Sequence, residues 1–129
     1  MNHIATHNRI NRILCGHPQQ VGNDFARVEM QTADEMAVDD TGLVHGGFIF
    51  GLADHAAMIA VNHPNVVLAA AEVKFLKPVA AHATVVAEAT VTAVDGKKKT
   101  VSADVYEADK KVFSGRFDCY VPDQHVLGG

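Results

Sequence analysis

Residues 46–62 read GGFIFGLADHAAMIAVN, the most apolar stretch of this 129-residue chain. The stretch is rich in Ala, Leu and Met and is longer than four helical turns, which favours a helix over a strand. A helix that is apolar on all sides must be wrapped by other elements. The sixteen residues from Gly46 to Val61 carry Asp54 and His55 at their middle. The helix is therefore too short and too polar to cross a bilayer.

The segments after this helix supply the wrapping, because their apolar residues alternate as in half-buried strands. The clearest alternation has Ala or Val at the odd positions from 83 to 93 and a polar even face that lies open. Asp95-Gly96 and Ala108-Asp109-Lys110 are typical of tight turns, which predicts an antiparallel meander. The four expected strands are Val66–Leu76, Ala83–Val94, Thr100–Glu107 and Val112–Val121.

The segment before the long helix predicts two further elements. Residues 1–16 are expected to contain a short amphipathic helix, which the Cys15-Gly16-His17-Pro18 sequence ends. Alternation from Asp24 predicts a strand that runs toward Val38. The element order predicts one α+β domain over residues 1–129, a curved antiparallel sheet around a central helix.

Composition limits the classes of function. The chain is 48% apolar and 20% charged, and its 11 basic and 15 acidic residues give a net charge of −4. This charge offers no basic field for nucleic acid or for a membrane surface, and we expect neither as a partner. Two cysteines in no metal-binding or disulfide pattern, and an amino terminus unlike a signal peptide, predict a reducing, cytoplasmic compartment.

Asp54 is the outstanding candidate for chemistry. Its helical neighbours three and four positions away, Phe50, Gly51, Ala57 and Met58, offer no charge partner. Burial among apolar groups raises the pKa of a carboxylate and suits it to act as a general base. The alternative is that Asp54 faces water or bonds to the backbone on the outer side of the helix.

A second candidate is the start of the helix at His45-Gly46-Gly47. The first N–H groups of a helix are free of internal partners and lie at the positive end of its dipole. A carbonyl oxygen bound there would be polarised. The alternative is that the two glycines only permit a tight turn or a close approach of another chain.

The string HGGFIFGLAD, residues 45–54, resembles the active-site signature of hot-dog-fold acyl-CoA thioesterases of the phenylacetyl-CoA, or PaaI-like, group. AEVKFLKPV, residues 71–79, resembles the strand that follows the helix in that family, and the similarity extends from about Asp24 to Tyr120. The resemblance implies the hot-dog fold. It also implies hydrolysis of a small to medium acyl or aryl-acyl coenzyme A thioester to the free acid and coenzyme A, without a metal or other cofactor.

The resemblance assigns roles to matching positions. Asp54 matches the catalytic carboxylate, Gly46 the backbone donor to the thioester carbonyl, and His45 the histidine that shapes the loop. Two positions depart from the family, since Asp39 stands where Asn or Gln is frequent and Met58 where Ser or Thr is frequent. The residues expected to contact the substrate are Gly47, Asp39, Met58, Lys74 and Lys77, the two lysines through the coenzyme A phosphates.

Geometry adds an expectation about assembly. Gly46 and Asp54 lie eight residues apart on one helix, roughly 12 Å along its axis at about 1.5 Å per residue. One carbonyl group cannot easily reach both. If they act together, Asp54 must meet Gly46 of a second chain, which predicts a two-fold homodimer with its sites at the interface. Whether two dimers form a tetramer stays open.

Two other functions compete with the thioesterase. A non-catalytic module that binds or senses acyl-CoA would gain nothing from an unpaired acid beside a reactive carbonyl. A hot-dog hydratase or dehydratase would need a positioned His and carboxylate pair. His3 and His7 have the i, i+4 spacing of metal ligands, but two ligands make a poor site, and no metal is expected.

Overall fold

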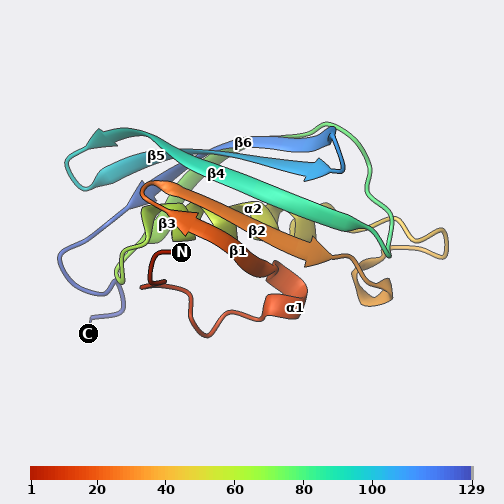
Figure 1. The fold of residues 1–129 in the computed structure, drawn as a ribbon, viewed down its shortest axis with the longest axis horizontal. Coiled ribbons are helices and arrows are strands. Elements are labelled where there is room, and N and C mark those ends of the chain that lie inside the picture. The colour runs from red at the N-terminus through yellow and green to blue at the C-terminus, as the bar shows by residue number, and fades with distance from the viewer. Residues whose placement is uncertain (129) are drawn as a thin grey trace.

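The computed structural model describes residues 1–128 as six strands in one sheet, wrapped around one long helix (Figure 1). The two helices are α1 (Arg12–Cys15) and α2 (Gly46–Val61). A short 3-10 helix, η1, covers Asp34–Met36. The strands are β1 (His17–Gly22), β2 (Phe25–Gln31), β3 (Val67–Phe75), β4 (Thr84–Asp95), β5 (Lys98–Glu107) and β6 (Lys110–Tyr120).

Helix α2 has the bounds that the sequence predicts. His45 caps its first turn, and Asn62, in the left-handed conformation at φ +54°, ends it by donating its N–H to the Met58 carbonyl. Ten of its sixteen residues are buried, as expected of a helix that is apolar on all sides. No helix within residues 1–128 is long and apolar enough to span a membrane.

The sheet has the order β1-β2-β4-β5-β6-β3, and every neighbouring pair is antiparallel. Its inner face packs on α2 through small and β-branched side chains, and Val85, Ala87 and Ala89 are fully buried. Ala93, expected on the same face, is exposed, because the pairing register of β4 and β5 shifts between Val91 and Ala93. The predicted α+β architecture, a curved antiparallel sheet around a central helix, is confirmed.

The predicted meander of four consecutive strands is wrong at its first step. The two predicted turns join β4, β5 and β6 in sequence, but β3 pairs with β6 at the far edge of the sheet. Both sides of β4 are already occupied, by β2 and β5. The segment after β3 therefore leads from the edge of the sheet, past β6 and β5, to the position of β4 between β2 and β5.

The amino-terminal predictions are confirmed in part. The expected short helix is present as a single turn, Arg12–Cys15, that ends at Gly16, and the residues before it form an irregular arm. Strand β1 has no counterpart among the predicted elements, because Pro18 indicates a helix stop. Strand β2 ends at Gln31 rather than near Val38, since the Thr32 hydroxyl turns the chain by donating to the Ala80 carbonyl, 2.7 Å away.

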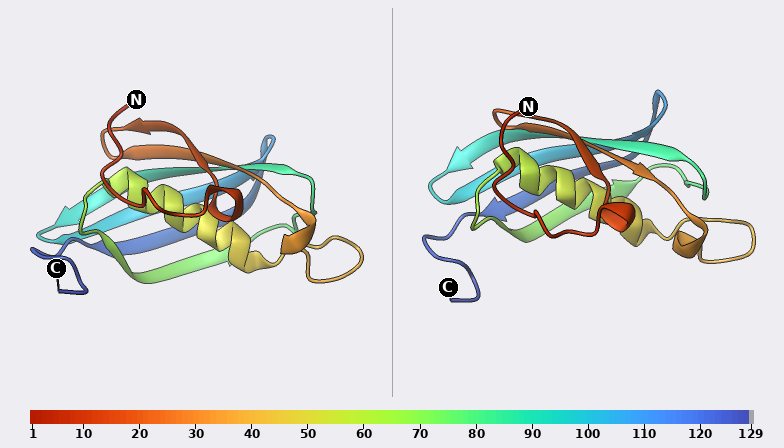
Figure 2. Two further views of the ribbon diagram at one scale, coloured as in Figure 1. Left: turned by 90° about the horizontal axis from the view of Figure 1, so that it is seen from below. Right: turned by 60° about the horizontal axis from the view of Figure 1, so that its bottom comes forward.

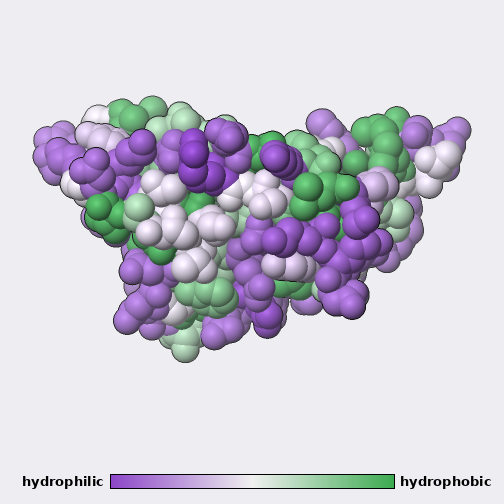
Figure 3. Space-filling view, turned by 90° about the horizontal axis from the view of Figure 1, so that it is seen from above, coloured by the Kyte–Doolittle hydropathy of each residue, from purple (hydrophilic) through white to green (hydrophobic). Residues whose placement is uncertain are grey.

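The two faces of the sheet differ in character. Figure 3 shows the outer face, where hydrophilic and weakly hydropathic residues separate smaller hydrophobic groups. Its side chains include the ion pair of Arg27 and Glu88. Figure 2 shows the opposite side, where α2 and the amino-terminal arm cover the sheet. The polar even face expected for β4 therefore lies on the open side.

Candidate active site

The start of α2 leaves one backbone donor free. His45 Nδ1 accepts the N–H of Gly47 at 3.3 Å, so the side chain that precedes the helix uses one of the first donors. Within residues 1–128 the N–H of Gly46 has no hydrogen-bond acceptor. Because it lies at the positive end of the helix dipole, it can donate to an oxygen that gains negative charge.

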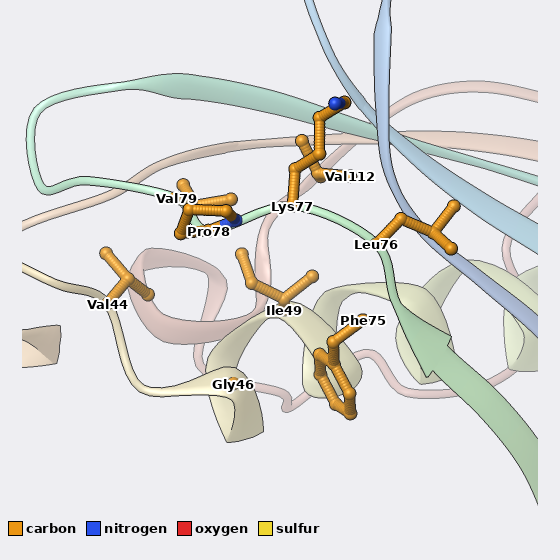
Figure 4. A pocket seen from close by; sticks show the side chains of 9 residues that line it. All are labelled: Val44, Gly46, Ile49, Phe75, Leu76, Lys77, Pro78, Val79 and Val112. Atoms are coloured by element: carbon orange, nitrogen blue, oxygen red, sulfur yellow. The ribbon is translucent and has the colours of Figure 1, made fainter.

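A mostly apolar hollow of about 260 Å³ adjoins Gly46 (Figure 4). A Cβ atom at Gly46 would lie 3.0 Å from the Phe75 ring, so a side chain there would require this ring to shift by a few tenths of an ångström. The hollow joins the start of α2 to the segment that follows β3. It is lined by Val44, Gly46, Ile49, Phe75, Leu76, Lys77, Pro78, Val79 and Val112.

Asp54 is a carboxylate in an apolar setting, as the sequence predicts. It is half-buried, and within the described residues its Oδ1 is shielded from solvent without a hydrogen-bond donor. Burial raises the pKa of Asp54 to about 6. A carboxylate of this kind accepts a proton more readily than an exposed aspartate and stays largely ionised at pH 7.

The charge of Asp54 acts on two thiols, one on α1 and one on β6. Burial raises the pKa of the Cys15 thiol on α1, and the charge of Asp54 raises it further. Burial, followed by the charges of Asp54 and Asp118, raises the pKa of the Cys119 thiol on β6 to about 12. The charge of Asp54 therefore adds to burial in keeping both thiols protonated.

The structure does not bring Asp54 and Gly46 together within one chain. They stand at the middle and at the start of α2, and Asp54 does not line the hollow beside Gly46. A site that uses both groups on one substrate therefore requires a second chain.

The inner face of β3 extends beyond the cover that one chain provides. Ala71 and Phe75 pair with Phe117 and Phe113 of β6, which are fully buried on the inner face. Phe75 is nonetheless 55% exposed, and Ala71 is also exposed. Among residues 1–128 no strand pairs with the other side of β3. An open backbone edge next to uncovered apolar side chains is typical of a surface that another chain covers.

Two of the expected substrate contacts are used differently within the chain. Asp39 Oδ1 accepts the hydroxyl of Thr41 at 2.6 Å and its N–H at 3.0 Å, and these bonds lower the pKa of Asp39. Asp39 therefore stabilises the turn before the helix. Met58 is 1% exposed and packs in the core.

The two expected lysines are free of carboxylate partners within residues 1–128, whereas Lys97 pairs with Asp123 at 2.8 Å. Lys74 is exposed on β3, in register with Ser114. Lys77 lines the hollow, and its side chain rises away from Gly46 (Figure 4).

His55 is a structural histidine. Its Nδ1 lies 3.0 Å from the carbonyl of Cys15, and its Nε2 is buried without a partner among the described residues. Its ring therefore does not form the His and carboxylate pair that a hydratase needs. Within residues 1–128 no three His, Cys, Asp or Glu side chains lie close enough to hold a metal ion.

Sequence reasoning missed the apolar lining of the hollow. Phe75, Leu76, Pro78 and Val79 lie within the string that resembles the family, but nothing in their spacing places them beside Gly46. It also missed Asn62, whose side chain binds the amino-terminal arm. An asparagine just after a helix signals an end cap and carries no information about a distant segment.

Comparison with known proteins places this chain in a family. Residues 41–114 match the sequence profile of the thioesterase superfamily. This match includes Gly46, Asp54 and the segment that lines the hollow.

Two curated relatives share much of the sequence. One, named methylthioribose-1-phosphate isomerase, from Aquifex aeolicus, is 51% identical over 114 residues, which are 88% of this chain and 25% of that protein. The other is transcription factor FapR of Bacillus subtilis, 34% identical over 100 residues, or 76% of this chain and 53% of that protein. The chain thus spans a quarter and about half of the relatives it matches.

Solved structures share the fold. An uncharacterized protein from Pyrococcus horikoshii is 51% identical, with a TM-score of 0.97 over 98% of this chain and 97% of that one. The PaaI protein of the E. coli phenylacetic acid degradation operon is 23% identical, with a TM-score of 0.82 over 92% of this chain and 88% of that one. The expected hot-dog fold is confirmed.

Proposed function

Because the chain belongs to the thioesterase superfamily, we propose that it hydrolyses the coenzyme A thioester of a small to medium acyl or aryl-acyl group. The observation that carries the proposal is the Asp54 carboxylate, half-buried, without a hydrogen bond at Oδ1 and with a pKa raised to about 6 by burial. A half-buried carboxylate without a hydrogen bond destabilises the fold, so its presence favours a functional role.

The reaction needs a donor for the thioester oxygen, and the Gly46 N–H is free for this purpose. As a nucleophile attacks the carbonyl carbon, negative charge grows on the oxygen, and the N–H at the start of α2 stabilises it. His45 holds the neighbouring N–H of Gly47 and so fixes the first turn of the helix.

The partner's Asp54 supplies the second half of the site. It either removes a proton from a water that attacks the carbonyl or attacks directly, forming a mixed anhydride that water then hydrolyses. Both routes release coenzyme A as the thiol. The exposed inner face of β3 supports a two-fold dimer in which each Asp54 meets the Gly46 of the other chain.

Lys74 and Lys77 are the cations that we assign to the coenzyme A phosphates, because neither pairs with a carboxylate within the described chain. The two free thiols, Cys15 and Cys119, accord with a reducing, cytoplasmic location.

The test is the release of free thiol from short, medium, aromatic and long acyl-CoA thioesters by the unmodified protein and by Asp54→Asn. The substitution keeps the size of the side chain and removes the base. We expect hydrolysis of at least one class, and a loss of about 100-fold or more in the variant. Equal rates in a folded, dimeric variant would refute the role of Asp54.

A second candidate function is a module that binds acyl-CoA without cleaving it. The 34% identity to a transcription factor, of which this chain spans about half, favours this alternative. Isothermal titration with a non-hydrolysable acyl-CoA thioether separates the two functions when combined with the thiol assay. Binding without thiol release from any thioester would favour the module over the enzyme.

A further inference from the structure

A separate hollow of about 520 Å³ lies between the amino-terminal arm, the segment that follows α2 and the carboxyl-terminal segment. It shares no lining residue with the hollow beside Gly46, which lies at the start of α2. Its volume falls within the range of about 300 to 1,000 Å³ that is usual for sites of small molecules. It is lined by residues 5–10 and by Pro64, Val66 and His125.

The end of α2 holds the arm that forms one wall of this hollow. The arm lies along α2 (Figure 2). Asn62 Nδ2 donates to the carbonyl of His3 at 2.7 Å, and Asn62 Oδ1 accepts the N–H of Ala5, the first lining residue, at 2.7 Å. One side chain thus fixes two points of the arm. A wall that is held in place before binding reduces the entropy cost of taking up a ligand.

The charged side chains around the hollow are basic. Arg9, His7 and His125 line it, and its described lining contains no Asp or Glu, although the chain has 15 acidic and 11 basic residues. Arg9 has no ion pair within residues 1–128. Burial lowers the pKa of His7, so Arg9 carries the fixed positive charge. The hollow therefore favours an anion.

The backbone adds hydrogen-bond donors beside this charge. His7 is in the left-handed conformation, at φ +57°, and its carbonyl accepts the N–H of Ile10 at 3.3 Å, which closes a turn over residues 7–10. Within residues 1–128 the N–H groups of His7, Asn8 and Arg9 have no acceptor. Successive free N–H groups in a turn form a concave site for anions. Three backbone donors therefore belong to the segment that carries the Arg9 guanidinium.

His125 adds a donor from the carboxyl-terminal segment. Its Nδ1 accepts the N–H of Leu127 at 3.0 Å. A backbone N–H can only donate, so the proton of the neutral His125 ring is on Nε2. Within residues 1–128 this Nε2 has no acceptor. The hollow thus has a free side-chain donor on a segment other than the arm.

The number of donors favours a phosphate over a carboxylate. A phosphate monoester has three terminal oxygens that accept hydrogen bonds, whereas a carboxylate has two. The planar guanidinium of an arginine also matches the spacing of phosphate oxygens and can donate to two of them. Arg9, the three free N–H groups and His125 together supply enough donors for all three oxygens.

We propose that this hollow binds a small organic phosphate, whose phosphate group is held by Arg9, by the free N–H groups of residues 7–9 and by His125. The apolar side chains of Ile10, Pro64 and Val66 give the organic part of the ligand a surface to contact. The proposal goes beyond thioester hydrolysis and does not depend on it, because no lining residue belongs to the proposed active site.

The test is a titration of the full-length protein with inorganic phosphate at constant ionic strength, followed by the amide NMR shifts of residues 6–10 and of His125. We expect these amides to shift and to saturate. Arg9→Gln should raise the Kd about tenfold or more, because a charge-assisted hydrogen bond is lost. His125→Ala should raise it about two- to tenfold, because the lost bond is to a neutral donor.

The matched control is Arg12→Gln. Arg12 lies on α1 near the arm, is exposed like Arg9, and does not line the hollow. The control therefore makes the same change of net charge close by, and the Kd should change less than about twofold, because exposed charges are screened. Equal increases of the Kd in Arg9→Gln and Arg12→Gln, or no saturable shift in the unmodified protein, would overturn the proposal.

Adenosine monophosphate and coenzyme A distinguish the two sources of such a phosphate. We expect at least one of them to bind more tightly than inorganic phosphate, and Arg9→Gln to weaken that binding as well. Tighter binding of adenosine monophosphate would assign the hollow to a free organic phosphate. Tighter binding of coenzyme A would assign it to a phosphate of the thioester substrate. If neither exceeds inorganic phosphate, the proposed contact of an organic group with the apolar lining is refuted.

Discussion

The two sides of the sheet handle charge in opposite ways. On the outer face, ion pairs join neighbouring strands, such as Arg27 with Glu88 and Lys111 with Asp104. On the side of α2, the helix carries one carboxylate, Asp54, and one histidine, His55, and neither has an ionic partner within residues 1–128. The ion pairs of the outer face suit it to contact with water and to aligning neighbouring strands. The unpaired carboxylate suits the helix side to proton transfer.

The two sides differ because water solvates and screens the charges on the outer face but reaches the helix side poorly. Exposed ion pairs gain little because water and salt screen them, so many can be present and none is critical. A half-buried carboxylate without a partner is poorly solvated, and each change in its surroundings moves its proton affinity. Substitutions of equal chemistry should therefore have unequal effects on the two sides.

The largest effect is expected from a matched pair of aspartates. Asp54 and Asp104 each have a buried Oδ1 without a hydrogen bond among the described residues, one on each side of the sheet. Asp54→Asn should lower kcat/KM for the best thioester by about 100-fold or more, the usual contribution of a general base. Asp104→Asn should change it less than about twofold, because Asp104 faces Lys111 on the outer side. Comparable losses of kcat/KM in Asp54→Asn and Asp104→Asn would refute the expected difference between the two sides of the sheet.

The next effect concerns the uncovered inner face of β3. Ala71→Glu places a charge on the exposed apolar surface that we assign to the dimer, so sedimentation should show a monomer, and the thiol assay should show a loss of activity. The control is Gln20→Glu on β1, the opposite edge of the sheet. A dimer that persists in Ala71→Glu would place the interface elsewhere.

A third prediction concerns the pH dependence of stability. The pKa of Asp54 is about 6 in the folded chain and about 3.8 when unfolded, so the free energy of unfolding falls as the pH rises from about 4 to 6. The decrease is about 3 kcal/mol, at about 1.4 kcal/mol for each pKa unit. Asp54→Asn should therefore be more stable than the unmodified protein at pH 8 but not at pH 4. Urea unfolding at one protein concentration tests this, and equal differences at both pH values would contradict it.

The smallest effect should come from the outer face. Arg27→Ala removes an ion pair of 2.7 Å between side chains that are 48% and 34% exposed. The free energy of unfolding should fall by about 1 kcal/mol or less, and the difference should shrink in high salt. A salt-insensitive loss of about 3 kcal/mol, the size of the pH effect expected at Asp54, would show that the outer face contributes more than screened charges.

Local pattern was enough to predict α2 and the two tight turns. The helix is apolar over its whole length and is followed by a His-Pro-Asn stop, so its bounds need no tertiary information. The hairpin at Gly96, where φ is +60°, follows from the Asp95-Gly96 pair. The isolation of Asp54 follows from the spacing of its helical neighbours.

Strand partners and the arm could not be predicted in this way. The alternation in β3 and β4 shows that each is a strand but not that they lie apart, because pairing depends on which edges remain free. Strand β1 lacks a clear alternation, and it forms because β2 offers it an edge. The bonds of Asn62 to His3 and Ala5 span more than fifty residues and have no local signal.

The sequence by itself determined that one long helix is wrapped by a sheet, that an acid stands alone on this helix, and that a free donor marks its start. These features depend on contacts within a few residues, where periodicity and capping act. Only the tertiary structure decided which strands end the sheet and where apolar surface remains open. These depend on competition between distant segments for the same surface, and only the packed chain resolves it.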